Sequence, residues 1–168
     1  MDNKNNFKKF ENQSGFDEQV VSINRVTKKT KGGNKMGFAA LAVVGDKNGR
    51  VGVGLGKAMD VSTAIRKAII LARKKLLTVP IINGTIPFRI DVKVGAAKIM
   101  LKPAPKGSGI IAGGAVRSVV SVAGIENISS KVLGTTNAVN NVYATMEALK
   151  QIAERHASSN HLKMGGKK

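Results

Sequence analysis

Two glycine-rich stretches are the parts of this 168-residue chain that could bind a phosphate. In the first, VGVGLGKA, glycines alternate at Gly52, Gly54 and Gly56 before Lys57. Many nucleotide sites combine a strand, a glycine loop, a lysine and a helix in this order. Their phosphate loop also needs a glycine at the position of Val51 and a hydroxyl after the lysine, where this chain has alanine. The spacing also differs from the G-x-G-x-x-G pattern, so a nucleotide site is disfavoured.

Two interpretations of this stretch remain. Alternating glycines inside a strand indicate that another part of the chain packs closely against it. Alternatively, the stretch is a phosphate-facing strand and turn, and the phosphates belong to RNA. We favour the second interpretation, with Gly54, Gly56 and Lys57 as contacts, because the charge of the chain calls for a polyanion.

The second stretch, PAPKGSGIIAGGAV, is similar to the phosphate loop of a family of small-molecule kinases. Those kinases need several loop hydroxyls, whereas Ser108 is the only one available here, and no matching acid or base is evident. A cradle for backbone phosphates is the better interpretation. Flexible N–H groups at Gly107 and Gly109 would then stand beside Lys106 and Arg117.

The sequence offers little for catalysis. It has no cysteine, and its two histidines lie at or beyond the end of the last expected helix. Its carboxylates are scattered, mostly at turns and caps, without the spacing of an acid–base pair or a metal site. We therefore expect no catalytic residue, no metal, no cofactor and no small-molecule substrate.

The net charge of +18, from 28 Lys and Arg against 10 Asp and Glu, is the strongest compositional signal. It is spread over both halves, and a compact fold with this surplus repels itself unless a polyanion neutralises it. Nucleic acid is the first candidate and an anionic membrane surface the second. Because aromatic residues make up only 4%, stacking on bases is disfavoured and contact with structured RNA by shape and phosphate is favoured.

A third basic segment, KKTKGGNK, is expected to be a loop with a flexible glycine pair at its tip. We favour RNA binding over a merely solvated turn, because the net charge already demands a partner. The expected RNA contacts in this segment are Lys28, Lys29, Lys31, Gly32, Gly33 and Lys35.

The elements that position these residues fall into two sets. β-Branched and apolar alternation predicts strands over residues 18–28, 36–46 and 50–56, with a turn in DKNGR. Asp60 is a good N-cap for a helix over 61–76, whose apolar stripe would cover the sheet. A three-stranded antiparallel sheet with one helix is a complete small domain, over residues 16–78.

The second set predicts a two-layer α/β domain with its helices on one face, over residues 79–156. Its strands are expected at 79–83, 88–94, 98–104 and 127–134, a glycine-entered helix ends near 123–125, and a last helix spans 135–156. We expect residues 1–15 to be a disordered arm and 157–168 a basic, mobile tail. No signal peptide or membrane span is evident, so a soluble, intracellular protein is expected.

Four stretches in this order and spacing resemble the bacterial small-subunit ribosomal protein five family. They are INRVTKKTKGG, VVGDKNGRVGVGLGKA, KGSGIIAGGAVRSVVSVAGI and LGTTNAVNNVYATMEAL, and the resemblance covers about residues 18–150. It implies an α+β protein. The first domain would resemble a double-stranded-RNA-binding domain without its first helix, and the second would have the βαβ-type fold shared with the kinases above.

The resemblance also implies a function: a non-enzymatic structural constituent of the cytoplasmic small ribosomal subunit. Its expected partners are 16S ribosomal RNA, ribosomal proteins four and eight, and messenger RNA where it enters the subunit, with effects on assembly and decoding accuracy. The basic loop at 31–33 is associated in the family with spectinomycin response. Arg25, Arg50 and Asn137 join the expected RNA contacts named above.

Two departures from the family are visible. Many members continue past the last helix into another short helical segment, which residues 157–168 replace here. Residues 1–15 match no part of the family pattern. The rival hypotheses are a nucleotide-dependent kinase and a protein that compacts nucleic acid without specificity.

Overall fold

The structure is a computed structural model that describes the backbone of residues 15–165 and the side chains of residues 15–158. The arm expected over 1–15 therefore lies, except for Gly15, outside the described residues. The elements in chain order are β1 (Asp17–Thr30), β2 (Gly33–Gly45), β3 (Arg50–Ala58), α1 (Val61–Lys74), β4 (Leu76–Thr78), β5 (Ile90–Val94), β6 (Ala97–Pro103), β7 (Ile110–Ile111), α2 (Gly114–Ala123), β8 (Ile128–Val132) and α3 (Ala138–Gly165).

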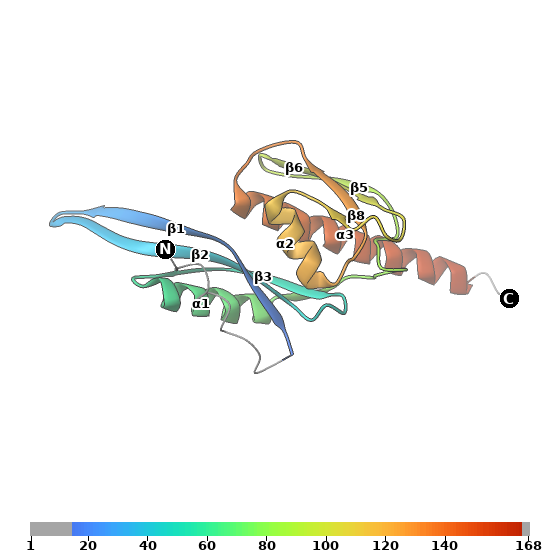
Figure 1. The fold of residues 1–168 in the computed structure, drawn as a ribbon, viewed down its shortest axis with the longest axis horizontal. Helices are drawn as coiled ribbons and strands as arrows, with labels where there is room; N and C mark the ends of the chain where they lie inside the picture. Colours follow the sequence, from blue (N-terminus) through green and yellow to red (C-terminus); the bar gives the residue numbers. More distant parts are fainter. Residues whose placement is uncertain (1–14, 166–168) are drawn as a thin grey trace.

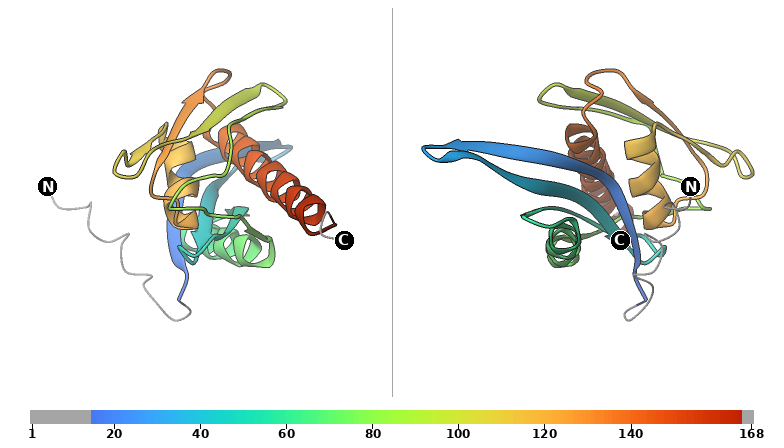
Figure 2. Two further views of the ribbon diagram at one scale, coloured as in Figure 1. Left: turned by 90° about the vertical axis from the view of Figure 1, so that its right-hand side faces the viewer. Right: turned by 60° about the vertical axis from the view of Figure 1, so that its left-hand side comes forward.

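These elements form four stacked layers (Figure 1). Helix α1 covers one face of the first sheet, which has the order β1-β2-β3-β4. Helices α2 and α3 lie between the other face of that sheet and the second sheet, of order β5-β6-β8-β7, as the turned views of Figure 2 also show. The expected α+β class is confirmed. No described helix is both long and apolar enough to cross a membrane.

The inner part of β2, from Ala39 to Gly45, is buried on both faces because its side chains alternate between two cores. Ala40 and Ala42 belong to a small core with α1, whereas Leu41 and Val43 belong to the large core that includes α2, α3 and the second sheet. The small residues on one face and the larger ones on the other set how closely each neighbouring layer approaches.

The alternating glycines of β3 are the counterpart of an alanine stripe on α1. Each glycine lies beneath one turn of the helix: Gly52 beneath Ala72, Gly54 beneath Ala68, and Gly56 beneath Ala64. A Cβ atom at any of the three would overlap the carbonyl oxygen of the alanine above it. The interpretation of Gly54 and Gly56 as phosphate-facing contacts is therefore wrong, because the helix backbone occupies that face.

The first sheet also gains a strand that was not expected. Helix α1 ends at Lys74 rather than at Leu76, and the chain turns back so that Leu76 pairs with Gly52 as part of β4. Asp60 stands at the N-cap as expected, but its side chain makes no capping hydrogen bond; its carbonyl oxygen accepts one from the N–H of Ala64 at 3.0 Å.

The second half confirms a βαβ unit and differs from the expected elements in one added strand, one missing strand and one longer helix. Strands β7 and β8 pair in parallel and are joined by α2, although β7 itself was not expected. The strand expected at 79–83 is absent from the described fold, where only an isolated bridge joins Ile82 to Thr85. Helix α3 continues past His156 to Gly165, so most of the segment expected as a tail is helical.

A turn from the first half caps the C-terminus of α2 in the second. The N–H groups of Lys47 and Gly49 donate to the carbonyl oxygens of Val122 and Ala123 at 3.2 and 2.9 Å. Gly124 ends the helix with a φ of 88° and lies against the backbone of Lys47, which leaves no room for a Cβ. One core runs through both halves, and the expected division at residues 78–79 stays a prediction.

We expect Gly54→Ala to destabilise the fold by about 1–3 kcal/mol and to lower the melting temperature by about 2–12 °C, because the new methyl group forces α1 away from β3. Gly32→Ala is the matched control, since a Cβ there meets nothing within 4 Å and should leave the melt unchanged. Thermal unfolding followed by circular dichroism measures both. Equal melting of Gly54→Ala and the unchanged chain would show that the close packing is not needed.

Candidate nucleic-acid interface

The expected basic loop is in fact the end of a long β-hairpin. From Ser22 outward, β1 pairs with β2 without interruption to Thr30 and Gly33, whereas β3 joins β2 only from Phe38 inward. The outer part is therefore a two-stranded ribbon, about 17 Å long at 3.4 Å per residue, that projects from the body (Figures 1 and 2). The Thr30 hydroxyl donates to the Gly33 carbonyl at 2.8 Å and closes the tip.

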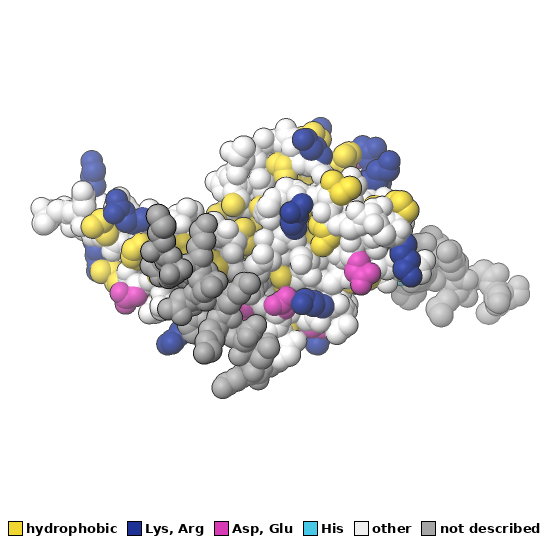
Figure 3. Space-filling view, in the orientation of Figure 1, with side chains coloured by type: hydrophobic (Ala, Val, Ile, Leu, Met, Phe, Trp, Pro, Cys, Tyr) yellow, Lys and Arg dark blue, Asp and Glu magenta, His cyan; other side chains and the backbone are white. Residues whose placement is uncertain are grey.

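This hairpin carries cations without counter-charges. The expected contacts Arg25, Lys28, Lys29, Lys31 and Lys35 are all exposed. No Asp or Glu occurs between residues 19 and 45, and no ion pair of the described residues involves any of the five. A space-filling view shows basic side chains gathered at this end of the molecule (Figure 3).

The placement of two lysines on the hairpin works against its stability. Lys28 lies directly opposite Lys35 in the ladder, and like charges at such a pair destabilise a sheet. Lys57 pairs opposite Ala39 and so lies on the same face of the sheet as both, at the base of the hairpin. These positions suit an external anion better than they suit the folded chain alone.

Arg50 has a structural role in the turn that caps α2. Its Nε donates to Oδ2 of Asp46 at 2.6 Å, and its guanidinium lies 5.5 Å from the ring centroid of Phe16. The other carboxylate oxygen of Asp46 accepts from the N–H groups of Asn48 and Arg50 at 2.9 and 3.0 Å. An RNA contact by Arg50 stays a prediction, since the side chain remains half exposed.

These hydrogen bonds change the acidity of Asp46. Burial alone would raise the pKa of Asp46, but the hydrogen bonds from Arg50 and Asn48, together with the positive charge of Arg50, outweigh it. The pKa of Asp46 therefore lies below its ordinary value, and its ionised form stabilises the turn.

The second glycine loop is not an open cradle of N–H groups. The side-chain oxygen of Asn127 accepts from the N–H groups of Gly107 and Gly109 at 2.9 and 3.2 Å. The N–H of Ser108 between them donates to Pro105 at 3.2 Å. The expected phosphate cradle is therefore wrong for these N–H groups, because the fold already uses all three.

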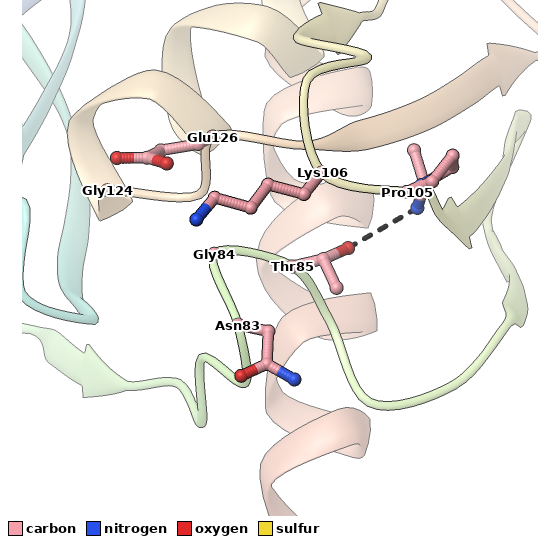
Figure 4. Close-up of a pocket in the computed structure, with 8 residues that line it drawn as sticks. Asn83, Gly84, Thr85, Pro105, Lys106, Gly124 and Glu126 are labelled. Carbon is pink, nitrogen blue, oxygen red and sulfur yellow. Dashed lines mark hydrogen bonds between the residues drawn. The ribbon is translucent and has the colours of Figure 1, made fainter.

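A hollow lies beside this loop (Figure 4). It is lined by the 83–85 turn, by Ala104 to Lys106, and by Gly124 and Glu126. The Lys106 side chain extends across it, and Thr85 accepts a 3.4 Å hydrogen bond from the N–H of Ala104. Lys106 is exposed and remains a candidate for contact with a phosphate.

The two remaining expected contacts, Arg117 and Asn137, belong to the helices of the second half. Arg117 is exposed on α2. Asn137 precedes α3, and its side-chain oxygen accepts from the N–H of Val139 at 3.0 Å, so its observed role is that of a helix cap. The residue that sequence reasoning missed is Asn127, which is buried and reaches backward to a loop 20 and 18 residues earlier.

Exposed cations without ion-pair partners among the described residues lie on a hairpin that projects from a two-sheet α+β body. Such a basic surface is typical of RNA-binding proteins. Two family models match the chain: Ribosomal protein S5, N-terminal domain, over residues 16–80, and Ribosomal protein S5, C-terminal domain, over residues 92–159. Together they span most of the sequence, and the chain belongs to the ribosomal protein S5 family.

Membership of this family makes the chain a ribosomal protein with a structural role in the small subunit. Its partners are ribosomal RNA and the ribosome, and it acts in translation as part of a ribonucleoprotein. The family is a structural one rather than a family of enzymes.

The Asp46 turn should make stability depend on pH in the acid range. Because folding lowers the pKa of Asp46, its ionised carboxylate contributes its full stabilisation of the fold above about pH 5. This stabilisation is lost as the pH falls below about 4, the ordinary pKa of an aspartate, and through the lowered pKa of the folded state. We expect Asp46→Asn to be less stable than the unchanged chain at neutral pH and to converge with it in acid. Urea unfolding at several pH values measures this, and parallel curves would contradict it.

Asn127→Ala should loosen the 104–109 loop, since two N–H groups lose their acceptor at a cost of about 1–3 kcal/mol. We expect faster hydrogen exchange at the amides of Gly107 and Gly109. Asn127→Asp is the control, because its carboxylate can still accept both hydrogen bonds. Unchanged exchange in Asn127→Ala would mean that the hydrogen bonds do not hold the loop.

Proposed function

We propose that this chain binds 16S ribosomal RNA directly and that the β1–β2 hairpin, with Lys57 at its base, makes the main contact. The observation that carries the proposal is the row of five exposed cations on a projecting ribbon without a carboxylate between residues 19 and 45. Gly32 and Gly33 carry no side chain and have open space around them in the free protein, so RNA could approach the backbone of the tip closely.

The chemistry of the hairpin favours phosphate contact over base stacking. Residues 25–37 contain no Phe, Tyr or Trp. Lysine ammonium groups on flexible stems bind phosphates as point charges, and such contacts position a protein without reading sequence. Specificity for ribosomal RNA would then come from the RNA shape that the projecting ribbon can reach.

The proposal extends to the setting of the protein in a cytoplasmic subunit. We infer neighbours among the small-subunit proteins, namely ribosomal proteins four and eight, and a place near the region where messenger RNA enters. Support of subunit assembly and of decoding accuracy follows from such a place. These inferences rest on the resemblance of the four sequence motifs to the family.

The competing hypothesis is a protein that compacts any nucleic acid. It shares the high positive charge but predicts equal binding to all duplexes and no retention on subunits. Sucrose-gradient fractionation of the tagged chain distinguishes the two, because a subunit component sediments with the small subunit after washing in moderate salt.

Neutralising the hairpin should weaken RNA binding and flatten its salt dependence. For Lys28, Lys29, Lys31 and Lys35 all changed to Gln, we expect the slope of log K against log salt to fall by about 3–4, or roughly one per phosphate contact. Filter binding to small-subunit ribosomal RNA over a range of KCl concentrations measures the slope.

Two controls separate this effect from general loss of charge or fold. The same four positions changed to Arg should keep the slope, since the charge remains. Lys150→Gln, on α3 and already 3.9 Å from Glu154, should change it little. A hairpin variant that melts normally and binds with the original slope would refute the proposed contact.

A further inference from the structure

The second sheet has one covered face and one open face. Its inward side chains, including Val92, Ile99, Leu101 and Ile128, are buried in the large core with α2 and α3. Strict alternation then sends every second residue outward, away from those helices. Figure 1 shows this outer face at the top of the molecule, with no described element above it.

The outer face is basic. Its exposed cations are Lys93 on β5, Lys98 and Lys102 on β6, and Lys131 on β8, with Met100 between them. None of them was among the contacts expected from the sequence. Figure 3 shows Lys and Arg side chains gathered along this side of the molecule, separate from those at the hairpin.

The register of the strands distributes the four lysines, Lys93, Lys98, Lys102 and Lys131, over the face in an arrangement that we call the lysine grid. Lys93 lies directly opposite Lys98, and Lys131 lies opposite Met100 on the next strand. With strands about 4.8 Å apart and residues on one face about 6.8 Å apart along a strand, the backbone positions of the four lysines span about 10 by 14 Å. That area is enough to meet several phosphates of one nucleic-acid helix.

No carboxylate of the described residues neutralises the lysines on this face. The one carboxylate on the face, Asp91, is already paired with Arg89 at 3.1 Å. No ion pair of the described residues involves the four lysines. Lys93 and Lys98, which lie opposite each other, repel and destabilise the sheet, and a bound external anion would relieve this repulsion.

We propose that the outer face of the second sheet is a second RNA-binding surface, which holds the phosphate backbone of a different RNA segment from the one on the hairpin. This inference deepens the proposed function and rests on it. The face has no aromatic side chain on which a base could stack, and its cations are lysines, which bind phosphates without reading bases.

The two surfaces are held apart by the body of the protein. The hairpin continues the first sheet to one side, whereas the second sheet presents its outer face beyond the α2–α3 layer (Figures 1 and 2). Because one core joins the halves, the two surfaces keep a fixed geometry. A protein built in this way bridges two RNA segments and gains affinity from holding both.

The first test neutralises the grid in the full chain. With Lys93, Lys98, Lys102 and Lys131 all changed to Gln, we expect binding to small-subunit ribosomal RNA to weaken at least about tenfold, and the salt slope to fall by about 3–4. The same positions changed to Arg should bind normally. The Gln variant should melt at or above the temperature of the unchanged chain, because the Lys93–Lys98 repulsion is gone.

The second test uses the absence of cysteine in the chain. An iron–EDTA probe tethered at Met100→Cys, on the outer face, should cleave one RNA segment by hydroxyl radicals in the reconstituted subunit. The same probe at Met36→Cys, exposed on the hairpin, should cleave a different segment. If the probe at position 100 cleaves no RNA, the face meets a protein or solvent and the proposal is overturned.

The outcomes separate the two proposals. If the hairpin variant loses affinity and the grid variant binds like the unchanged chain, only the second surface is refuted. If the grid variant alone loses affinity and the probe at position 100 cleaves RNA, the second surface stands and the hairpin assignment falls. If the unchanged chain does not bind ribosomal RNA, both fall together.

Discussion

The cap that the 46–49 turn places on helix α2 is the interaction on which the architecture depends. The last carbonyl groups of a helix need donors, and here the N–H groups of Lys47 and Gly49 supply them from the other half of the chain. The turn is held in shape by the Asp46 carboxylate, and Gly124 removes the side chain that would block its approach. A local hydrogen-bond network thus fixes the orientation of one sheet with respect to the other.

Close packing on both faces of the first sheet completes this arrangement. The glycines of β3 admit the alanine stripe of α1 on one side, while Leu41 and Val53 enter the shared core on the other. These layers bury the inner parts of β2 and β3, so the proposed RNA contacts of the first sheet lie on the projecting hairpin and, at its base, on Lys57. The second sheet is covered on one face alone, so its contact surface is the open face.

The distribution of charge follows from these two packing solutions. Within the described residues, buried positions are almost all apolar, and two groups of exposed lysines lie on the hairpin and on the outer face of the second sheet. Both regions place like charges opposite each other in a β-ladder, at Lys28 and Lys35 and at Lys93 and Lys98. Such pairs weaken the free protein, and bound phosphates would relieve them. In the small subunit, the surplus of positive charge has a polyanion to neutralise it.

The sequence by itself determined the class of fold, most strands and helices, the charge, and the basic segment between the first two strands, because period-two and period-3.6 patterns and net charge are local or additive properties. Much of the candidate site could be predicted in this way, including the hairpin lysines. The role of Gly54 and Gly56 could not, because alternating glycines suit a phosphate or a helix backbone equally well, and only the tertiary structure shows that α1 lies across them. Likewise, the hydrogen bonds from Gly107 and Gly109 to Asn127 join residues distant in the chain. The alternation of Lys98 and Lys102 with apolar residues was visible in the sequence. The packing of α2 and α3 against the opposite face decided which side of the strand would be covered.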